Sequence, residues 1–240
     1  MLTYDELQHH SRKFLALTGL TLKEFKALLP AFERAYARKY SVHKTHHGKK
    51  RKRQVGGGRK STLDCPEQKL LFILVHQKTY PVQTLLGELF DLSQSRTNDW
   101  IHRLLPILKQ ALDDLGVLPE RDPQRFARHE KQQSGSRNYI IDGTERRRQR
   151  PKNPEKQALY YSGKKKAHSD KNVVITHRRT KRVGYLSQTY AGKTHDKKVA
   201  DTEAVTYPRG SQLHKDTAFQ GYEPPGCRTY QPKKSHGRPN

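Results

Sequence analysis

The stretch "RNYIIDGTERRRQRP", residues 137–151, decides the fold and raises the main question about this sequence. The apolar run from Tyr139 to Ile141 is typical of a buried strand, and it leads directly to an acid, Asp142, which several arginines follow. An Asp-Gly pair is also a hairpin signal, so a turn at Asp142 is the plain alternative. The other interpretation is that the carboxylate holds a metal ion while the arginines hold an anion.

The charge of the chain points to a polyanionic partner. Among 240 residues there are 48 Lys and Arg against 23 Asp and Glu, so the formal net charge is +25. Self-repulsion of this size is relieved when a polyanion neutralises it. Nucleic acid is the first candidate, because neutralising phosphates releases condensed counterions. Charge alone leaves a membrane-surface or ribosome-associated protein open.

Other features of the composition narrow the class of protein. The apolar runs are too short to span a membrane, and the N-terminus lacks the hydrophobic region of a signal peptide. The cysteines, Cys65 and Cys227, lie far apart, which excludes a disulfide framework and a cysteine-rich zinc site. We therefore expect a cytoplasmic protein, associated with the bacterial nucleoid, that has no membrane partner.

The first part of the chain predicts helices and then a basic linker. Residues 1–42 indicate a helical pair, because capping-box patterns begin at Thr3 and Thr21. Residues 43–60 form a basic, glycine-rich linker suited to lie along a phosphate backbone. The linker residues that we expect to bind DNA are Lys49, Lys50, Arg51, Lys52 and Arg53.

Residues 61–118 show the pattern of a helix-turn-helix DNA-binding region. A short helix from about Val82 to Phe90 is followed by a tight connection, and Ser93 is then a good cap for a second helix. The first turns of that second helix are where base edges would be read. The polar side chains there are Gln94, Ser95, Arg96 and Asn98.

After a polar linker at residues 119–136, the sequence becomes strand-rich over residues 137–240. A strand ending in Asp142 precedes two hairpin-linked strands, a short helix capped by Asp196, and a strand ending at Asp216. This order is expected of a ribonuclease H-like mixed sheet with helices, in which the first and fourth strands are neighbours. The fold class is therefore α+β, with an all-helical N-terminal region.

Neighbouring first and fourth strands would bring Asp142 and Asp216 together, and two carboxylates repel each other unless a cation neutralises them. A divalent metal does so. Mg²⁺ prefers a few carboxylates plus phosphate oxygens, and Mn²⁺ is the alternative. Nearby basic side chains would hold the DNA backbone, and Tyr160 and Tyr161 would stack on an unpaired base. The basic residues are Arg146, Arg147, Lys164, Lys165 and Lys166.

Four blocks carry a family resemblance: "IIDGTERRRQRP", "YYSGKKKAH", "AGKTHDKKVAD" and "KDTAFQGYEPP". In this order they resemble bacterial insertion-sequence transposases with a DDE catalytic core, of the insertion-sequence-five group related to PIF/Harbinger transposases. The resemblance runs from about residue 50 to 234. It implies a protein that binds terminal inverted repeats of double-stranded DNA, cuts with Mg²⁺ and joins a 3′-hydroxyl to target DNA. Asp142 matches the first catalytic acid and Asp216 the second, and a homo-oligomer stays open.

The resemblance also implies a third acid, a Glu on a helix after the fifth strand. The sequence stops at "QPKKSHGRPN", just after that strand, so we expect a truncated core that lacks this Glu. The alternative function is then a catalytically inactive, sequence-specific DNA-binding protein or repressor. An RNA-binding protein is a third interpretation, which the missing aromatic RNA-recognition motifs disfavour.

Overall fold

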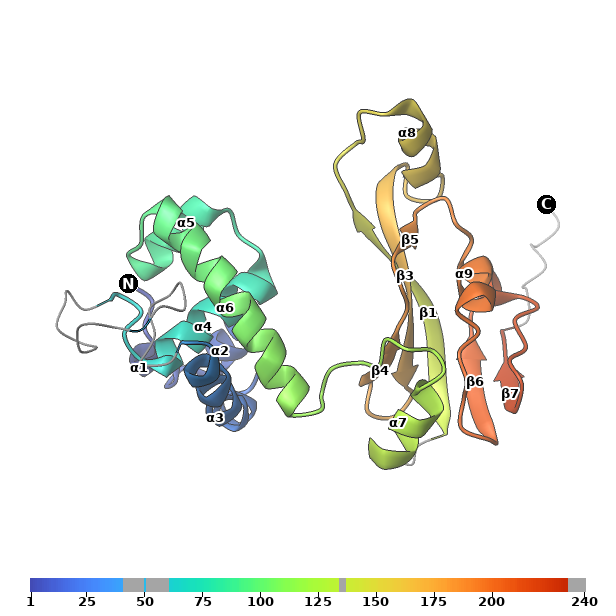
Figure 1. Cartoon of the computed structure of the whole chain (residues 1–240), viewed down its shortest axis with the longest axis horizontal. Coiled ribbons are helices and arrows are strands. Elements are labelled where there is room, and N and C mark those ends of the chain that lie inside the picture. Colours follow the sequence, from blue (N-terminus) through green and yellow to red (C-terminus); the bar gives the residue numbers. More distant parts are fainter. Residues whose placement is uncertain (41–49, 51–60, 134–136, 233–240) are drawn as a thin grey trace, which may run out of the picture. The chain divides into compact units, whose positions relative to one another are not determined.

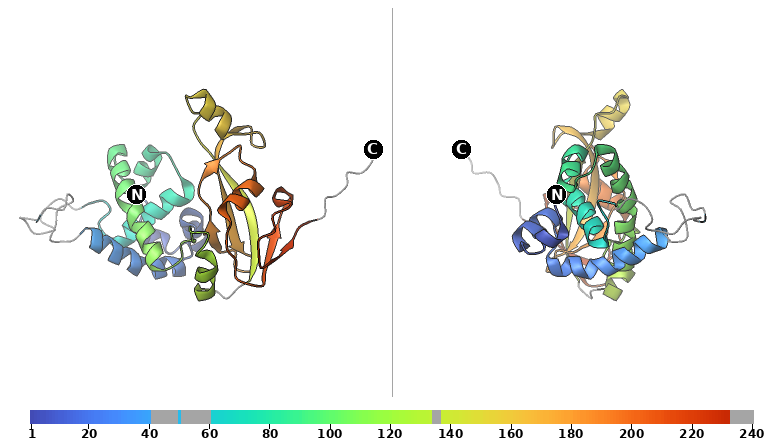
Figure 2. Two further views of the ribbon diagram at one scale, coloured as in Figure 1. Left: turned by 45° about the vertical axis from the view of Figure 1, so that its right-hand side comes forward. Right: turned by 90° about the vertical axis from the view of Figure 1, so that its left-hand side faces the viewer.

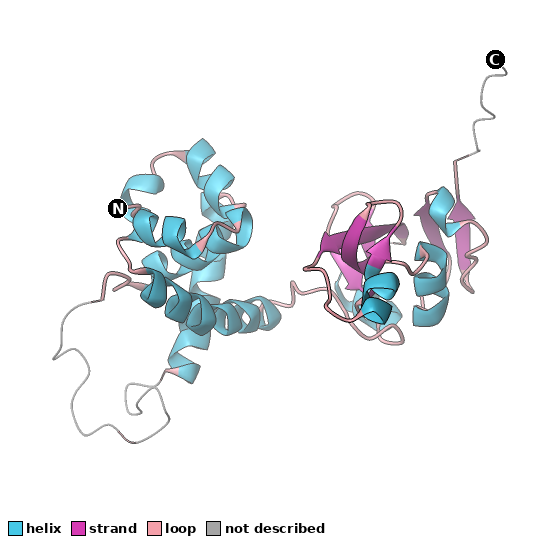
Figure 3. Ribbon diagram, turned by 90° about the horizontal axis from the view of Figure 1, so that it is seen from above, coloured by secondary structure: helices cyan, strands magenta, loops and turns pink. Residues whose placement is uncertain are grey.

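The computed structural model describes residues 1–40, 50, 61–133 and 137–232, which form two compact units, Met1–Val117 and Leu118–Asn240. In the described parts, the first unit is helical and the strands of the sheet belong to the second, as Figure 3 shows. The predicted linker at 43–60 lies outside the described residues except for Lys50, which is exposed. Its other predicted DNA contacts also lie outside them, namely Lys49, Arg51, Lys52 and Arg53.

The helices of the first unit begin at the predicted caps. Thr21 and Glu24 make a reciprocal capping box, and Thr3 accepts a hydrogen bond from the Glu6 amide. The helical pair predicted for residues 1–42 is nevertheless three helices, because the first segment is divided into a single turn and a longer helix. The helices are α1 (Tyr4–Leu7), α2 (Ser11–Thr18), α3 (Leu22–Lys39), α4 (Pro66–Thr79), α5 (Gln83–Phe90) and α6 (Gln94–Asp114).

One hydrophobic core joins these helices. The middle of α4, from Leu70 to Val75, is buried on every side, as expected of a helix that is apolar all round. Aromatic rings from the other helices pack around it, so residues 1–42 and 61–118 share a core instead of forming separate cores. The fully buried phenylalanines from the other helices are Phe14, Phe25, Phe32 and Phe90, and they join Phe72 of α4 itself. None of the helices in the described part of the chain is both long and apolar enough to cross a membrane.

The predicted helix-turn-helix is confirmed at α5 and α6. Asp91 ends α5 in the left-handed conformation with φ of 53°, and the Ser93 side chain caps α6 by accepting from the Arg96 amide at 3.4 Å. Gly87 of α5 packs closely on the turn and on α6, because an added Cβ would lie 2.4 Å from the Leu92 carbonyl oxygen and 3.0 Å from the Thr97 hydroxyl. A larger residue at 87 would therefore push the two helices apart.

The second unit is built on a mixed sheet of the order β2-β3-β1-β6-β7, with β4 and β5 also paired to β3 (Figure 1). Strand β1 is antiparallel to β3 and parallel to β6. The predicted first and fourth strands are thus neighbours, and the α+β class with a ribonuclease H-like sheet is confirmed. The strands are β1 (Asn138–Arg147), β2 (Tyr161–Ser162), β3 (Ala167–His177), β4 (Val183–Leu186), β5 (Tyr190–Ala191), β6 (Ser211–Lys215) and β7 (Cys227–Tyr230).

Strand β1 corrects the prediction that its strand ends at Asp142. It continues for five residues beyond the acid and pairs with β3 as far as Arg147, opposite Ser169. No hairpin turn occurs at Asp142. The strand continues because Gly143 and Glu145 stay on the same face as Ile141 and keep their neighbours on β3. The second of the two predicted hairpin-linked strands is likewise divided, into β4 and β5.

Helices α7 (Phe126–Gln133) and α9 (Asp196–Glu203) cover one face of the sheet (Figure 2). This corrects the linker expected at residues 119–136, because Phe126 of α7 is fully buried in the core of the sheet. Glu130, also fully buried, is held by His177 at 2.7 Å and Arg182 at 3.0 Å. Two further short elements are α8 (Pro154–Tyr160) and the 3-10 turn η1 (Thr217–Phe219).

Candidate functional site

The two predicted acids meet on the face opposite α7 and α9. The parallel pairing of β1 with β6 ends with Ile141 beside Lys215. Asp142 and Asp216 are the next residues of these two neighbouring segments, so they lie side by side at the end of the pairing. Both acids are exposed. They line one pocket of about 570 Å³, to which Arg178 and Tyr230 also contribute. The carboxylate pair therefore lines an open pocket that is large enough for a phosphodiester.

A backbone N–H orients each of these acids. The Gly143 amide donates to Asp142 Oδ1 at 2.7 Å, and the Ala218 amide donates to Asp216 Oδ1 at 3.0 Å where Asp216 caps η1. The Gln231 side chain donates to the Asp216 carbonyl oxygen at 3.1 Å. Within the described residues, the second oxygen of each carboxylate takes no hydrogen bond from the protein, so it can face a ligand.

The donor set suits a hard divalent cation. Two carboxylates with room for water and phosphate oxygens match the way Mg²⁺ is bound in proteins. The neighbouring ammonium of Lys215 does not compete, because its side chain is buried, donating to the Tyr222 carbonyl oxygen at 2.7 Å and pairing with Glu223. In the described part of the chain, no group of three or more His, Cys, Asp or Glu could hold a metal.

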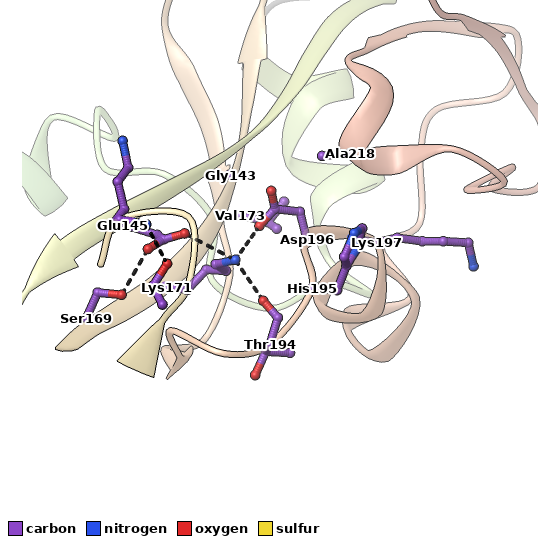
Figure 4. A network of polar contacts seen from close by, with 12 residues as sticks. Gly143, Glu145, Ser169, Lys171, Val173, Thr194, His195, Asp196, Lys197 and Ala218 are labelled. Carbon is purple, nitrogen blue, oxygen red and sulfur yellow. Dashed lines mark hydrogen bonds and ion pairs between the residues drawn. The ribbon is translucent and has the colours of Figure 1, made fainter. Parts of the chain in front are cut away.

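A second group of charged side chains, drawn in Figure 4, contains two acids and a lysine and lies on the face of the sheet that α9 covers. Lys171 Nζ lies 3.3 Å from Glu145 Oε1 and 2.8 Å from Asp196 Oδ1, and it donates to the Thr194 carbonyl oxygen at 2.7 Å. The side chains of the three charged residues are at most 14% exposed. This ion cluster, made of Glu145, Lys171 and Asp196, joins β1, β3 and the start of α9.

The surroundings of Glu145 favour its ionised form. Burial by itself raises the pKa of its carboxyl, but hydrogen bonds with Ser162 and Ser169 and the charge of Lys171 outweigh that effect. The net result is a pKa below the ordinary glutamate value. The Ser169 hydroxyl donates to Glu145 Oε2 at 2.9 Å.

The ion cluster touches the backbone beside Asp142. A Cβ on Gly143 would lie 2.7 Å from the carboxyl carbon of Asp196, so the acid packs directly against the β1 main chain (Figure 4). This corrects the prediction that Asp196 caps its helix, because the cap is His195, whose Nδ1 accepts from the Lys197 amide at 3.3 Å. Sequence reasoning also missed Lys171, although its place on the buried face of an alternating strand is a signal.

Most of the basic residues predicted near the sheet are available to a ligand. Arg147 is exposed, and the exposed Arg146 donates to the Asn172 side chain at 3.1 Å. Lysines 164–166 are exposed in the connection between β2 and β3, the last of them in a left-handed conformation. They lie beyond the end of the pairing between β1 and β3, far along the strand from the carboxylate pair.

The two tyrosines predicted to stack on a base differ in access. The guanidinium of Arg148 lies 3.9 Å from the centre of the Tyr160 ring and is fixed there by Asp170 at 2.8 Å. One face of Tyr160 is therefore already covered. Tyr161 is 45% exposed, and its ring makes an edge contact with His168, with the ring centres 5.6 Å apart.

The predicted base-reading residues lie at the start of α6. Gln94, Ser95 and Arg96 are exposed, and Asn98 is half-buried. Gln83, which sequence reasoning did not single out, accepts from Gln94 Nε2 at 2.9 Å and donates to Asn98 Oδ1 at 2.9 Å. Only the packing of α5 on α6 brings Gln83 to that position.

Two models of known protein families match the chain, one over the sheet and one over the helix-turn-helix. A family model described as DDE superfamily endonuclease matches residues 141–237. Another, described as helix-turn-helix of DDE superfamily endonuclease, matches residues 61–114. No curated protein and no solved structure matches the chain. The first match includes Asp142 and Asp216, and the second includes all of α4, α5 and α6.

Proposed function

We propose that this chain binds element ends and cuts DNA at its carboxylate pair. The premise is that its two matched regions support a DDE-superfamily transposase. Helix α6 would recognise the terminal inverted repeats, and Asp142 and Asp216 would hold Mg²⁺, or Mn²⁺ in its place. The finer assignment is a bacterial insertion sequence of the insertion-sequence-five group. Transfer of the cut 3′ end to target DNA completes the proposed activity.

One observation supports this proposal above the others. Asp142 and Asp216 are 74 residues apart in sequence, yet they extend from adjacent parallel strands to one exposed pocket. Two neighbouring carboxylates repel each other, and a bound divalent cation removes that repulsion. DDE superfamily endonuclease domains generally use divalent metal ions. A divalent metal ion is also the ligand that the pair Asp142 and Asp216 suits.

Each residue around the pair would then have a distinct role. The acids hold the metal, which when bound neutralises the charge of the reacting phosphate and activates the attacking oxygen. Arg178 lines the same pocket and can hold a non-bridging phosphate oxygen. Arg146 and Arg147 lie four and five residues further along β1, about 13–17 Å from Asp142, and would bind phosphates of the flanking duplex.

The test uses the full chain and a supercoiled plasmid that carries the coding sequence with its flanking DNA. We expect nicking that requires Mg²⁺ or Mn²⁺ and that stops in Asp142→Asn and in Asp216→Asn, while both variants still bind DNA. Glu155→Gln, an exposed acid on α8, is the matched control and should nick normally. Equal nicking by Asp142→Asn would refute the metal assignment.

Recognition of the ends is tested separately at α6. Arg96→Ala should weaken binding to the element ends more than binding to unrelated duplex, because base contacts confer sequence preference while phosphate contacts do not. The measurement is a pair of binding titrations at fixed salt. A uniform loss on both duplexes would contradict the assignment of α6 as the recognition helix.

The alternative is a DNA-binding protein or repressor that does not cut. The helical unit supports it, because α5 and α6 belong to a compact unit with its own core. Salt-sensitive binding to the ends, with no nicking in Mg²⁺ or Mn²⁺, would favour this alternative.

A further inference from the structure

Three side-chain amides form a hydrogen-bonded ladder at the start of the recognition helix. Gln83 is the first residue of α5, Gln94 is the first residue of α6, and Asn98 follows one turn later. Gln94 Nε2 donates to Gln83 Oε1, and Gln83 Nε2 donates to Asn98 Oδ1, both at 2.9 Å. The middle residue of this ladder therefore belongs to the other helix.

The ladder leaves each of the two outer amides able to donate and to accept. A side-chain amide has two N–H donors and an oxygen with two lone pairs. Gln94 uses one N–H to donate to Gln83, and Asn98 uses one lone pair to accept from Gln83. Both amides therefore keep at least one donor and one acceptor for another partner. Reversing all three amides would leave the same capacity. A donor beside an acceptor on one amide matches N7 and N6 of adenine in the major groove.

The spacing of the two amides fits neighbouring base pairs. Residues four apart lie on the same face of a helix and about 6 Å apart along its axis. Base pairs in B-form DNA rise by about 3.4 Å, so Gln94 and Asn98 would reach bases roughly two pairs apart. Gln94 is exposed and Asn98 half-buried, so both amides are at the surface where a major groove would lie.

Gln83 is itself held on a rigid support. Helix α5 approaches α6 closely at Gly87, where a Cβ would lie 3.0 Å from the hydroxyl of the buried Thr97. That hydroxyl donates to the Ser93 carbonyl oxygen at 3.0 Å, which ties the turn to α6. A long glutamine side chain normally loses rotamer freedom on binding, and the ladder removes much of that cost before DNA arrives.

We propose that Gln83 is a specificity-determining residue that holds Gln94 and Asn98 as a matched pair of adenine readers. The ligand is duplex DNA with two adenines about two base pairs apart, on edges that face the major groove. This inference rests on the proposed function, in which α6 enters the major groove of an element end. Gln83 acts through the other two residues, so it is a positioning residue.

The experiment is selection of bound duplexes from a random pool by the full-length protein. Gln94→Ala should lose the adenine preference at one position, and Asn98→Ala at the other. Gln83→Met, which keeps the side-chain length and removes both hydrogen bonds, should weaken both preferences by about threefold to tenfold, part of the discrimination that a good bidentate contact provides. Affinity for unselected duplex should stay within about twofold.

The matched control is Gln110→Met on the same helix. Its side chain is exposed and donates to Asp114 at 3.0 Å, so the variant loses a similar hydrogen bond far from the start of α6. It should keep both preferences. A thermal melt of each variant shows whether the fold is retained, and a purely structural role for Gln83 would lower stability without changing the selected bases.

Four outcomes overturn the inference. Selected sites without paired adenines would refute the ligand, while unchanged preferences in Gln83→Met would refute the positioning role. A loss in Gln83→Met that is equal for all sequences would do the same. A wild-type protein that selects no duplex at all would instead refute the proposed function, and this inference with it.

Discussion

Two pairs of carboxylates lie on opposite faces of the same sheet, and they differ in what neutralises them. Glu145 and Asp196 lie on the covered face, where Lys171 contacts both and their side chains are 8% and 14% exposed. Asp142 and Asp216 lie on the open face, and in the described part of the chain neither makes an ion pair. Strand β1 thus contributes one acid to each pair, Asp142 on the open face and Glu145, three residues later, on the covered face.

The difference follows from solvent access. A buried carboxylate pair needs a fixed internal cation, because water does not solvate it there. Lys171 provides that cation, so the charge of this pair is already neutralised within the protein. An exposed pair is stable in water without one, so its charge stays available to a ligand. The same residue type therefore supports the framework on one face and the proposed chemistry on the other.

The largest expected effect separates the two pairs by metal binding. Asp142→Asn should weaken Mn²⁺ binding tenfold or more, since even outer-shell changes cost about 10–100-fold, and should lower nicking at least about 100-fold. Glu145→Gln should change both by only a few fold. The measurement is titration of free Mn²⁺ by electron paramagnetic resonance. Equal losses in the two variants would remove the distinction between the pairs.

Next in size is the loss of the internal cation. Lys171→Met leaves two buried carboxylates without compensation and should lower the free energy of unfolding by about 3–5 kcal/mol. The triple variant with Glu145→Gln and Asp196→Asn has no buried charge and should recover much of that loss. Urea unfolding of the full chain measures both. If the single variant were as stable as wild type, the cluster would not support the framework.

A smaller effect is expected at Gly143, where Asp196 of the ion cluster packs against the main chain of β1. Gly143→Ala places a methyl group 2.7 Å from the Asp196 carboxyl carbon and should cost about 1–3 kcal/mol of stability. In an Asp196→Ala background the same change should cost much less, because the obstructing carboxylate is gone. Urea unfolding of the four proteins in this cycle gives the coupling energy. Additive costs would show that Asp196 does not press on β1.

The smallest effect is a dependence of stability on pH. The pKa of Glu145 is lowered on folding, so its stabilisation is complete above the ordinary value of about 4.5 and disappears as pH falls through the lower folded value. Wild type should therefore lose more stability than Glu145→Gln between about pH 5 and pH 3. Parallel curves of unfolding midpoint against pH would contradict the lowered pKa.

Sequence reasoning was most successful where the signal lies within a few residues. The caps at Thr21 and Ser93 and the turn between α5 and α6 were predicted correctly, because a cap and its partner are three residues apart. The placement of Asp142 beside Asp216 was also predicted, through the expected strand order. The end of β1 was predicted wrongly, because an Asp-Gly pair favours a turn only when no neighbouring strand continues the pairing.

By itself the sequence determined the helical and strand-rich halves, the basic character, and the two acids that end up together. Tertiary structure alone decided that Lys171 lies between Glu145 and Asp196, that α7 packs on the sheet, and that Gln83 joins Gln94 to Asn98. These contacts depend on strand register and helix packing. A shift of one residue moves a side chain to the other face of a sheet, and a local pattern does not say which residue of another strand or helix it will meet there.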